Sequence, residues 1–174
     1  MELKQGIALI NHSVLKNTYT TIWADLGCGD GFFTNVLSSF LVEGSTVYAV
    51  DSNPSALKRV TIPSSIILKK TLLDISREEL PFDEINGIIM ANSLHYIKQQ
   101  EVFLKKIKHY LVDDDGVLLI VEYDTNKANP WVPYPVNFKL LERLCNDARF
   151  SSVEKINQIP SAFGRSNIYA ALIK

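Results

Sequence analysis

The sequence predicts an α/β fold: a doubly wound, mostly parallel sheet of seven strands with helices on both faces and an antiparallel C-terminal hairpin. Short β-rich runs alternate with segments whose apolar residues recur at helical spacing, which is the pattern of βαβ units. Only about ten residues separate the last two predicted strands, too few for a helical crossover, so these two strands should pair as a hairpin.

The first half of the chain begins with a β-rich run over 21–26 that ends in glycines. Residues 32–42 follow with apolar side chains at helical spacing, and 46–50 form a second strand. Residues 54–60 are predicted as a short helix, because the proline at its start suits a first helical turn. A third strand is predicted over 65–68.

The middle of the chain supplies two further strands and the clearest helix. Residues 85–91 are nearly all apolar, which predicts a strand buried on both faces. Residues 98–111 form an amphipathic helix with lysines on its polar side, and 117–121 form the next strand after a glycine. The predicted apolar face of this helix comprises Val102, Phe103, Ile107, Tyr110 and Leu111.

The C-terminal part contains a helix over 136–148 and the two hairpin strands over 153–158 and 168–173. The longest irregular stretch, 124–135, precedes them and contains three prolines. Because long loops in compact domains often carry function, we expect this loop to border a functional site.

Length and composition limit the class of protein. The 174 residues fit one domain, 1–174, in which residues 1–20 precede the first strand as a short lid segment. No apolar stretch could span a bilayer and no signal peptide is apparent, so the expected location is cytoplasmic. Two cysteines give neither a disulfide framework nor a zinc site, so no metal is expected. A net charge of −1 argues against nucleic acid as the main partner, and the oligomeric state is not predicted.

The sharpest motif is the run Asp25-Leu26-Gly27-Cys28-Gly29-Asp30-Gly31 between the first strand and the next helix. Glycines permit a tight turn and the close approach of a ligand to the backbone. The run departs from the dinucleotide fingerprint G-x-G-x-x-G, because Phe32 stands where the third glycine belongs. The carboxylates of Asp25 and Asp30 would repel a pyrophosphate but suit an ammonium and a sulfonium, which favours S-adenosylmethionine over NAD. The alternative is a tight turn that binds no ligand.

Asp51 ends the second strand, one strand away from the glycine run. An acidic residue at this place accepts hydrogen bonds from the two hydroxyls of a ribose, so Asp51 supports a ligand that contains adenosine. The alternative is a turn or N-cap aspartate ahead of Pro54.

The runs D-L-G-C-G-D-G and A-V-D-S-N-P resemble those of the class I S-adenosylmethionine-dependent methyltransferases, in particular their small-molecule branch, which includes quinone-biosynthesis enzymes. The resemblance extends from about Thr21 to the end of the chain, and its first motif is the most specific. It implies a Rossmann-like sheet of about seven strands whose last strand lies antiparallel beside the sixth, in agreement with the hairpin.

The resemblance implies a role for each matching position in binding S-adenosylmethionine. It assigns the methionine part to the glycine loop, through Asp25, Gly27, Cys28 and Gly29. It assigns the ribose to Asp51 and the adenine to Ser52, Asn53, Asp74 and Ile75. For Asp74 the alternative is a loop or N-cap aspartate without a ligand.

The resemblance also places Ala91, Asn92 and His95, around the end of the fourth strand, near the cofactor and its transferred methyl group. His95 is the candidate general base, with Asn92 beside it, if the acceptor must lose a proton. The alternative for His95 is a packing role behind the cofactor. The polar-Pro-Pro-aromatic signature of amino-methylating relatives is missing at 91–94, which argues against DNA adenine or protein glutamine as the acceptor.

Aromatic residues follow the fifth strand at Tyr123, Trp131 and Tyr134. Because this strand ends at the ligand edge of the sheet, all three are candidates for contacting the acceptor. The alternative is that they pack against the proline-rich loop and hold it in place.

These features favour an enzyme that transfers a methyl group from S-adenosylmethionine to a small, partly apolar acceptor by in-line displacement. A second hypothesis is a non-catalytic S-adenosylmethionine-binding module or partner subunit of the same fold. A third, a nicotinamide-dependent oxidoreductase, is disfavoured by Phe32 and by the C-terminal hairpin.

Overall fold

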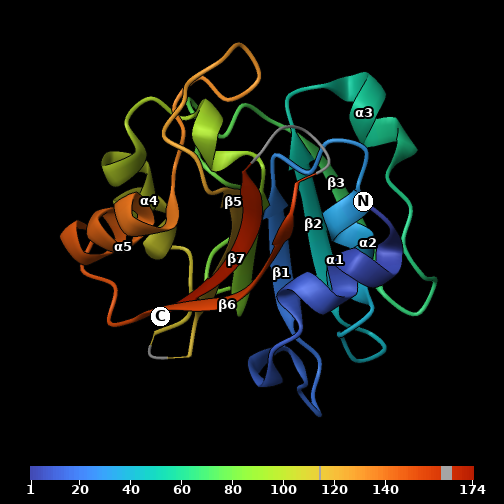
Figure 1. Cartoon of the computed structure of the whole chain (residues 1–174). Helices are drawn as coiled ribbons and strands as arrows, with labels where there is room; N and C mark the ends of the chain where they lie inside the picture. The colour runs from blue at the N-terminus through green and yellow to red at the C-terminus, as the bar shows by residue number, and fades with distance from the viewer. Residues whose placement is uncertain (114, 162–165) are drawn as a thin grey trace.

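The structure, a computed structural model, describes residues 1–113, 115–161 and 166–174. These residues form a seven-stranded sheet in the order β3-β2-β1-β4-β5-β7-β6 (Figure 1). The strands, in chain order, are β1 (Ile22–Leu26), β2 (Thr46–Asp51), β3 (Ile67–Leu72), β4 (Gly87–Ala91), β5 (Val117–Tyr123), β6 (Val153–Pro160) and β7 (Asn167–Ile173).

The strand directions change at β7. All neighbouring pairs among β1 to β5 are parallel, whereas β7 is antiparallel to both β5 and β6. The C-terminal hairpin therefore folds back so that β7, and not β6, joins the parallel part of the sheet. This arrangement confirms the predicted doubly wound sheet with an antiparallel hairpin at its end.

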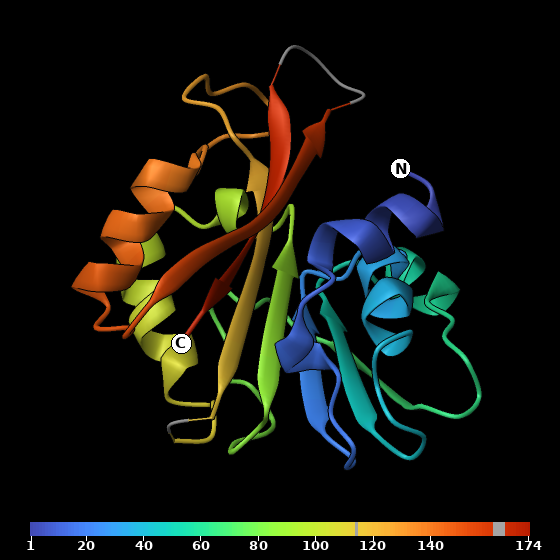
Figure 2. The same cartoon turned by 60° about the horizontal axis from the view of Figure 1, so that its bottom comes forward.

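Helices cover both faces of the sheet, as predicted (Figure 2). α4 and α5 pack on one face, whereas α1 and α2 pack on the other, with α3 beside β2 and β3. No helix in the described part of the chain is long and apolar enough to cross a membrane. The helices are α1 (Leu3–Ile10), α2 (Phe32–Ser38), α3 (Pro54–Arg59), α4 (Gln100–Lys108) and α5 (Phe138–Asp147), with short 3₁₀ helices η1 (Ser13–Leu15) and η2 (Leu94–Tyr96).

The hydrophobic core has two halves, one on each face of the sheet. In β4, Ile88 and Met90 pack with α4 and α5, whereas Ile89 packs with α1 and α2. β5 alternates in the same way, and its residues from Leu118 to Val121 are fully buried. Burial on both faces explains why these strands appear in the sequence as continuous apolar runs.

Two of the predicted helices are longer than the observed ones by four residues or more. α4 spans Gln100–Lys108 instead of 98–111, and the prediction that Val102 lies on its apolar face is wrong, because Val102 exposes 62% of its surface. The buried residues Phe103, Leu104 and Ile107 define a face that leaves Val102 on the opposite side of the helix. α2 ends at Ser38 instead of residue 42. At this end of the helix the Ser38 hydroxyl donates a hydrogen bond to the Thr34 carbonyl at 2.8 Å.

The third strand lies later in the chain than predicted. β3 spans Ile67–Leu72 instead of 65–68, because it pairs in continuous register with β2 from Thr46 to Asp51. It is an edge strand, and its exposed residues include Lys69 and Lys70. Charged residues suit an edge strand, but here they interrupt the apolar pattern that would have indicated its full length.

Candidate functional site

A cavity of about 930 Å³ opens at the edge where the parallel strands end. The strand order reverses between β1 and β4, and ligands of open α/β sheets bind at such a point, outside the carboxyl ends of the strands. The chain segments that follow β1, β2, β3 and β4 all contribute to the lining, and Tyr123 contributes from the end of β5. Met1 and Gln5 of the N-terminal segment complete one wall.

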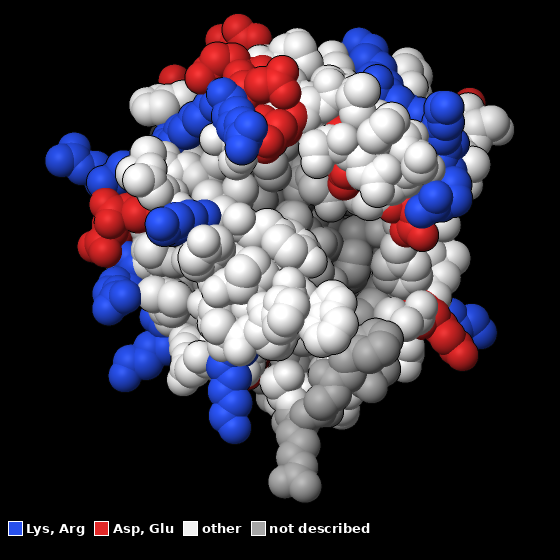
Figure 3. All heavy atoms as spheres, turned by 90° about the horizontal axis from the view of Figure 1, so that it is seen from above, with Lys and Arg blue, Asp and Glu red and all other residues white. Residues whose placement is uncertain are grey.

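The surface around this edge is poor in basic residues. Viewed from above, the molecule is hollowed near its centre, and lysine and arginine side chains gather toward the outer margin (Figure 3). The described residues that line the cavity include no lysine or arginine, but they include Asp25, Asp30, Asp51 and Asp74. The charge of the lining therefore suits a cationic ligand better than one that carries phosphates.

The glycine loop, residues 27–31, turns away from β1 and leaves room for a ligand. Gly27 and Gly29 have φ angles of 77° and 56°, in the left-handed region that favours glycine. A Cβ on Gly27 would lie 2.6 Å from the Cβ of Ser93, so a larger residue does not fit there. A Cβ on Gly29 would meet no atom within 4 Å, because this residue faces the open cavity.

Asp25 lies in β1 and is almost fully buried, with 1% of its surface exposed. Its Oδ2 accepts a hydrogen bond from the Thr34 hydroxyl at 2.7 Å, whereas its Oδ1 has no partner among the described residues. Burial raises the pKa of this carboxyl to about 7; the Thr34 hydrogen bond opposes the rise and the negative charge of Asp51 adds to it. A buried carboxyl group with a free oxygen at a cavity wall can pair with a cationic group of a ligand.

Asp51 ends β2 and joins the two loops that follow β1 and β2. Its Oδ2 accepts the backbone N–H of Gly29 and its Oδ1 accepts the backbone N–H of Asn53, each at 2.7 Å. A carboxylate offers about four lone-pair sites, so about two remain for further donors. The two hydroxyls of a ribose would fill them.

Of the residues predicted around the adenine, Ser52, Asp74 and Ile75 line the cavity. Asn53 is not among the lining residues, because its Oδ1 accepts the backbone N–H groups of Ser55 and Ala56 and so caps α3. The N-cap role that the sequence offered as an alternative for Asp51 thus belongs to the side chain of Asn53.

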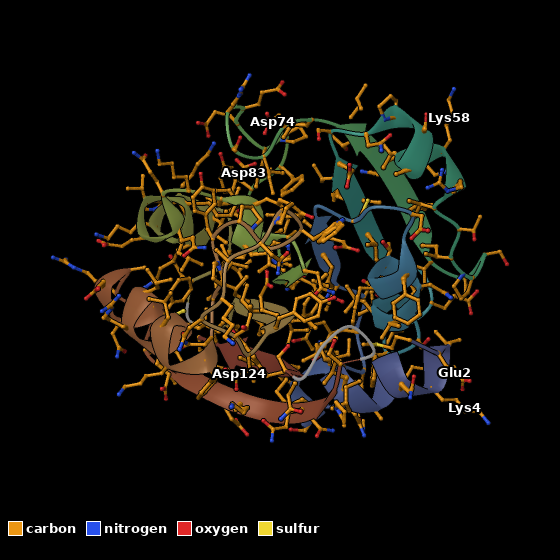
Figure 4. All side chains as sticks on the ribbon, turned by 45° about the horizontal axis from the view of Figure 1, so that its top comes forward. Glu2, Lys4, Lys58, Asp74, Asp83 and Asp124 are labelled. Atoms are coloured by element: carbon orange, nitrogen blue, oxygen red, sulfur yellow. The ribbon has the colours of Figure 1, made fainter. Side chains whose placement is uncertain are left out.

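Asp74 lies on the loop after β3, together with Asp83 (Figure 4). Its Oδ1 accepts the hydroxyl and the backbone N–H of Ser76 at 2.6 and 3.0 Å. The hydroxyl contributes most to lowering the pKa of Asp74, so this carboxyl group is ionised at neutral pH. Asp74 therefore combines the local turn role expected as its alternative with a place in the cavity wall.

Cys28 also lines the cavity, and its thiol is unsuited to act as a nucleophile. Burial raises the pKa of this thiol, and the negative charge of Asp25 adds to the effect. A thiol of raised pKa stays protonated at neutral pH and reacts slowly. Its contribution to the site is a small side chain and a backbone N–H that donates to the Val50 carbonyl at 3.0 Å.

Ala91 and Asn92 line the cavity at the end of β4. Asn92 adopts the left-handed conformation, with φ 53°, and its backbone N–H donates to the Val121 carbonyl at 2.8 Å. Its side-chain Oδ1 is buried without a partner among the described residues. An unpartnered buried acceptor in a strained loop is typical of a position that contacts a ligand.

A second cavity, of about 1290 Å³, adjoins the first and shares Asn92, Tyr96 and Tyr123 with it. Its other described lining residues are His95, Asp124, Thr125, Asn126, Lys127, Asn129, Trp131, Val132 and Ser166. The loop predicted over 124–135 therefore lines this second cavity.

The three aromatic residues predicted to contact an acceptor lie in different environments. Tyr123 and Trp131 line the second cavity, and Trp131 exposes 76% of its surface. Tyr134 lines neither cavity. Its backbone N–H donates to the His95 carbonyl at 3.0 Å and its carbonyl accepts Nε2 of Gln100 at 2.8 Å, so it fixes the loop.

His95 forms a buried pair with Glu122, a residue that the sequence analysis missed. Nδ1 of His95 lies 2.6 Å from Oε2 of Glu122, and the His95 backbone N–H donates to Oε1 at 3.1 Å. The exposed fractions of the two residues are 1% and 0%. The available sequence signal was a single charged residue in the otherwise apolar run V-L-L-I-V-E-Y. Within the described chain, no group of three or more His, Cys, Asp or Glu is placed to hold a metal ion.

A cavity at the point where the strand order reverses, a glycine loop and carboxylates around it are typical of α/β proteins that bind nucleosides. The chain matches the model of the methyltransferase domain family over residues 8–167, and it belongs to this family. Its cofactor is S-adenosylmethionine, as the glycine loop predicted. The sequence has no match among the curated proteins with which it was compared.

Several solved structures share the fold. The 1,6-didemethyltoxoflavin-N1-methyltransferase of Burkholderia thailandensis, with 1,6-didemethyltoxoflavin and S-adenosylhomocysteine bound, is 18% identical, with a TM-score of 0.71 over 98% of this chain and 76% of that one. The magnesium protoporphyrin IX methyltransferase of Synechocystis PCC 6803, with S-adenosylmethionine bound, is 15% identical, with a TM-score of 0.68 over 98% and 77%. The YcgJ protein of Bacillus subtilis is 11% identical, with a TM-score of 0.67 over 98% and 95%.

Proposed function

We propose that this protein transfers the methyl group of S-adenosylmethionine to a small, partly apolar acceptor bound in the second cavity. The observation that carries the proposal is a shared wall, because Asn92, Tyr96 and Tyr123 line both cavities. A methyl donor in the first cavity and an acceptor in the second would meet at this wall. Proximity and orientation of two reactants contribute several kcal/mol, up to about 7–11 in the best cases.

The residues of the first cavity fit the cofactor. Asp25 and Asn92 each present a buried oxygen without a partner in the described chain, and Gly29 leaves space where a side chain would stand. When bound, S-adenosylmethionine supplies a methyl group activated by a sulfonium. In our proposal Asp25, Gly27, Cys28 and Gly29 hold the methionine part, and Asp51, Ser52, Asp74, Ile75 and Ala91 hold the adenosine part.

The second cavity suits a small acceptor that is partly apolar. Tyr96, Tyr123, Trp131 and Val132 offer aromatic and aliphatic surface, and polar groups of the loop after β5 lie among them. Aromatic walls with a few polar groups are usual for small-molecule sites. The described lining contains one lysine, Lys127, and no arginine, whereas binding a nucleic acid backbone requires several such residues.

The N-terminal segment forms part of the wall, and we propose that it acts as a lid. Leu9 and Ile10 anchor α1 in the core, whereas Met1 and Gln5 reach the first cavity. The anchored end would stay in place while the first turn closes over the cofactor. Closure of a site expels water, which strengthens the electrostatic interactions inside it.

Ligand class is tested by thermal unfolding with S-adenosylmethionine, S-adenosylhomocysteine and NAD. Each of the first two, at 100 times its Kd, should stabilise the protein by about 2.7 kcal/mol and raise its Tm. NAD should have little effect, because its pyrophosphate would face the carboxylates of the first cavity. A larger shift with NAD than with either methionine nucleoside would contradict the assignment. Binding without transfer to any acceptor would favour a non-catalytic module.

The acceptor site is tested by Trp131→Ala. Loss of this exposed aromatic wall should raise the KM for the acceptor about tenfold. The affinity for S-adenosylmethionine should stay within about twofold, because Trp131 does not line the first cavity. Tyr19→Ala serves as the control, since Tyr19 is 60% exposed and lines neither cavity. Equal KM values for the two variants would show that Trp131 does not contact the acceptor.

A further inference from the structure

The buried pair of Glu122 and His95 lies at the end of the sheet where the two cavities meet. Glu122 belongs to the last part of β5, and His95 belongs to η2, just after β4. Both oxygens of this carboxylate are committed to one residue, since Oε1 accepts the backbone N–H of His95 and Oε2 lies against its Nδ1. A buried carboxylate is tolerated when it is paired in this way, so the contact fixes both the position and the ring orientation of His95.

The contact with Glu122 also favours one position for the ring proton of His95. A separation of 2.6 Å between Nδ1 and a carboxylate oxygen requires a hydrogen bond, and an ionised carboxylate can only accept it. Nδ1 is therefore the donor, and in a neutral ring Nε2 keeps its lone pair. Nε2 is buried without a hydrogen-bond partner among the described residues.

Two aromatic residues that line both cavities lie beside the ring of His95. The rings of Tyr96 and Tyr123 have centroids 4.4 and 6.3 Å from that of His95, and His95 lines the second cavity. Tyr96 exposes 56% of its surface, so its side chain, which lies next to the His95 ring, has room to rotate toward solvent. Catalytic hydrogen bonds often form only when the substrate is in place.

We infer that His95 and Glu122 form a proton-accepting pair for the acceptor, with Nε2 of His95 as the base and Glu122 as the positioning residue. It follows that the acceptor is a neutral molecule whose nucleophilic oxygen or nitrogen carries a proton, of the phenol, enol or ring N–H class. The unpartnered Oδ1 of Asn92, which borders the same cavity, is a second acceptor and also suits a protic ligand. This inference rests on the proposed function.

The proton and the electrons balance in a single displacement. The O–H or N–H bond of the acceptor breaks, and its proton goes to Nε2 of His95. The electron pair left on the acceptor atom forms the new bond to the methyl carbon. The bond between that carbon and the sulfonium sulfur breaks, and its electron pair stays on sulfur as a neutral thioether. Glu122 stabilises the imidazolium that results, because its Oε2 lies 2.6 Å from Nδ1.

The position of the ring proton can be measured without a substrate. In protein labelled with ¹⁵N in its histidine rings, with His95→Asn to assign the signals, we expect a protonated Nδ1 and an unprotonated Nε2 at pH 7.5. Glu122→Gln should move the proton to Nε2, because the new amide donates to Nδ1. Glu154→Gln is the matched control, since Glu154 is exposed and its Oε2 lies 3.7 Å from Nε2 of His12. This variant should leave the His95 signals unchanged. A protonated Nε2 in the unaltered protein overturns the inference.

The acceptor class is tested with phenol, indole, anisole and benzenethiol in the presence of saturating S-adenosylmethionine. Phenol or indole should shift the Nε2 signal and accept the methyl group, whereas anisole, which has no acidic proton, should do neither. Glu122→Gln and His95→Gln should each lower kcat at least about a hundredfold, and the double variant no further. If Glu122→Gln does not fold, His95→Gln alone provides the test of the base.

Two outcomes overturn the acceptor class: a Nε2 signal that neither phenol nor indole shifts, and transfer to benzenethiol alone. Calorimetric titration of the cofactor separates this result from a failure of the proposed function. If S-adenosylmethionine binds normally while the His95 tests fail, only the role of the His95–Glu122 pair is refuted. A protein that does not bind S-adenosylmethionine refutes the proposed function itself.

Discussion

Lowering the pH from 8 to 6 should weaken the binding of S-adenosylmethionine about tenfold, because Asp25 must lose a proton before it can pair with an ammonium group. Burial raises the pKa of Asp25 to about 7, and the charge of Asp51 adds to the rise against the opposing Thr34 hydrogen bond. At pH 8 the carboxyl group is mostly ionised, whereas at pH 6 it is mostly protonated. Isothermal titration at pH 6, 7 and 8 measures the effect.

The same carboxyl group should make the free protein less stable as the pH rises. Its pKa is about 7 in the folded state and 3.8 as its ordinary value, so between these limits the folded chain binds the proton more tightly than the unfolded chain. The contribution of Asp25 to the free energy of unfolding is therefore fully present below about pH 4 and is lost as the pH rises to about 7. The total loss is about 4 kcal/mol. This direction is opposite to that of an aspartate held in a salt bridge.

Asp25→Asn separates this carboxyl group from the other acidic residues. The amide oxygen can still accept the Thr34 hydroxyl, so the fold should survive without the pH-dependent loss. Cofactor binding should be weak and nearly independent of pH between 6 and 8. Asp83→Asn is the control, since Asp83 is exposed and lines neither cavity, and its binding curve should follow that of the unaltered protein. A flat affinity in the unaltered protein would show that Asp25 does not pair with the ammonium.

Features that depend on local sequence could be predicted. The glycine loop is specified by residues adjacent in the chain. The central strands of the sheet can be recognised in the sequence because both of their faces are apolar. The hairpin of β6 and β7 follows from the short connection alone. By contrast, the extent of β3 depends on its pairing with β2. Lys69 and Lys70 interrupt its apolar pattern, so the sequence does not show its full length.

Features that depend on tertiary contacts could not be predicted. Glu122 and His95 are 27 residues apart, and only the pairing of β4 with β5 brings their side chains together. The sequence shows His95 as a candidate base but offers no indication of its partner beyond a charge in an apolar strand. Asn53 was expected near the adenine, yet it directly precedes Pro54, the first residue of α3. Its side chain therefore accepts hydrogen bonds from free N–H groups of this helix and acts as its N-cap.

Asp51→Ala should lower the affinity for S-adenosylmethionine at least about tenfold and also destabilise the protein by about 2 kcal/mol. The variant loses the acceptor that holds the backbone N–H groups of Gly29 and Asn53, so the glycine loop is no longer fixed to the end of β2. It also loses the lone pairs that we assign to the ribose hydroxyls. Calorimetric titration of the folded variant and urea unfolding measure the two effects separately.

The neighbouring variant Asn53→Ala distinguishes loss of the ribose acceptor from general loosening of this loop. Its side chain caps α3 through Ser55 and Ala56, so its removal should cost about 1 kcal/mol of stability. Cofactor affinity should remain within about twofold, because the Asn53 side chain does not line the first cavity. If Asn53→Ala lowers the affinity for the cofactor as strongly as Asp51→Ala does, both variants act by loosening the loop after β2. An unchanged affinity in Asp51→Ala would instead exclude Asp51 from the ribose site.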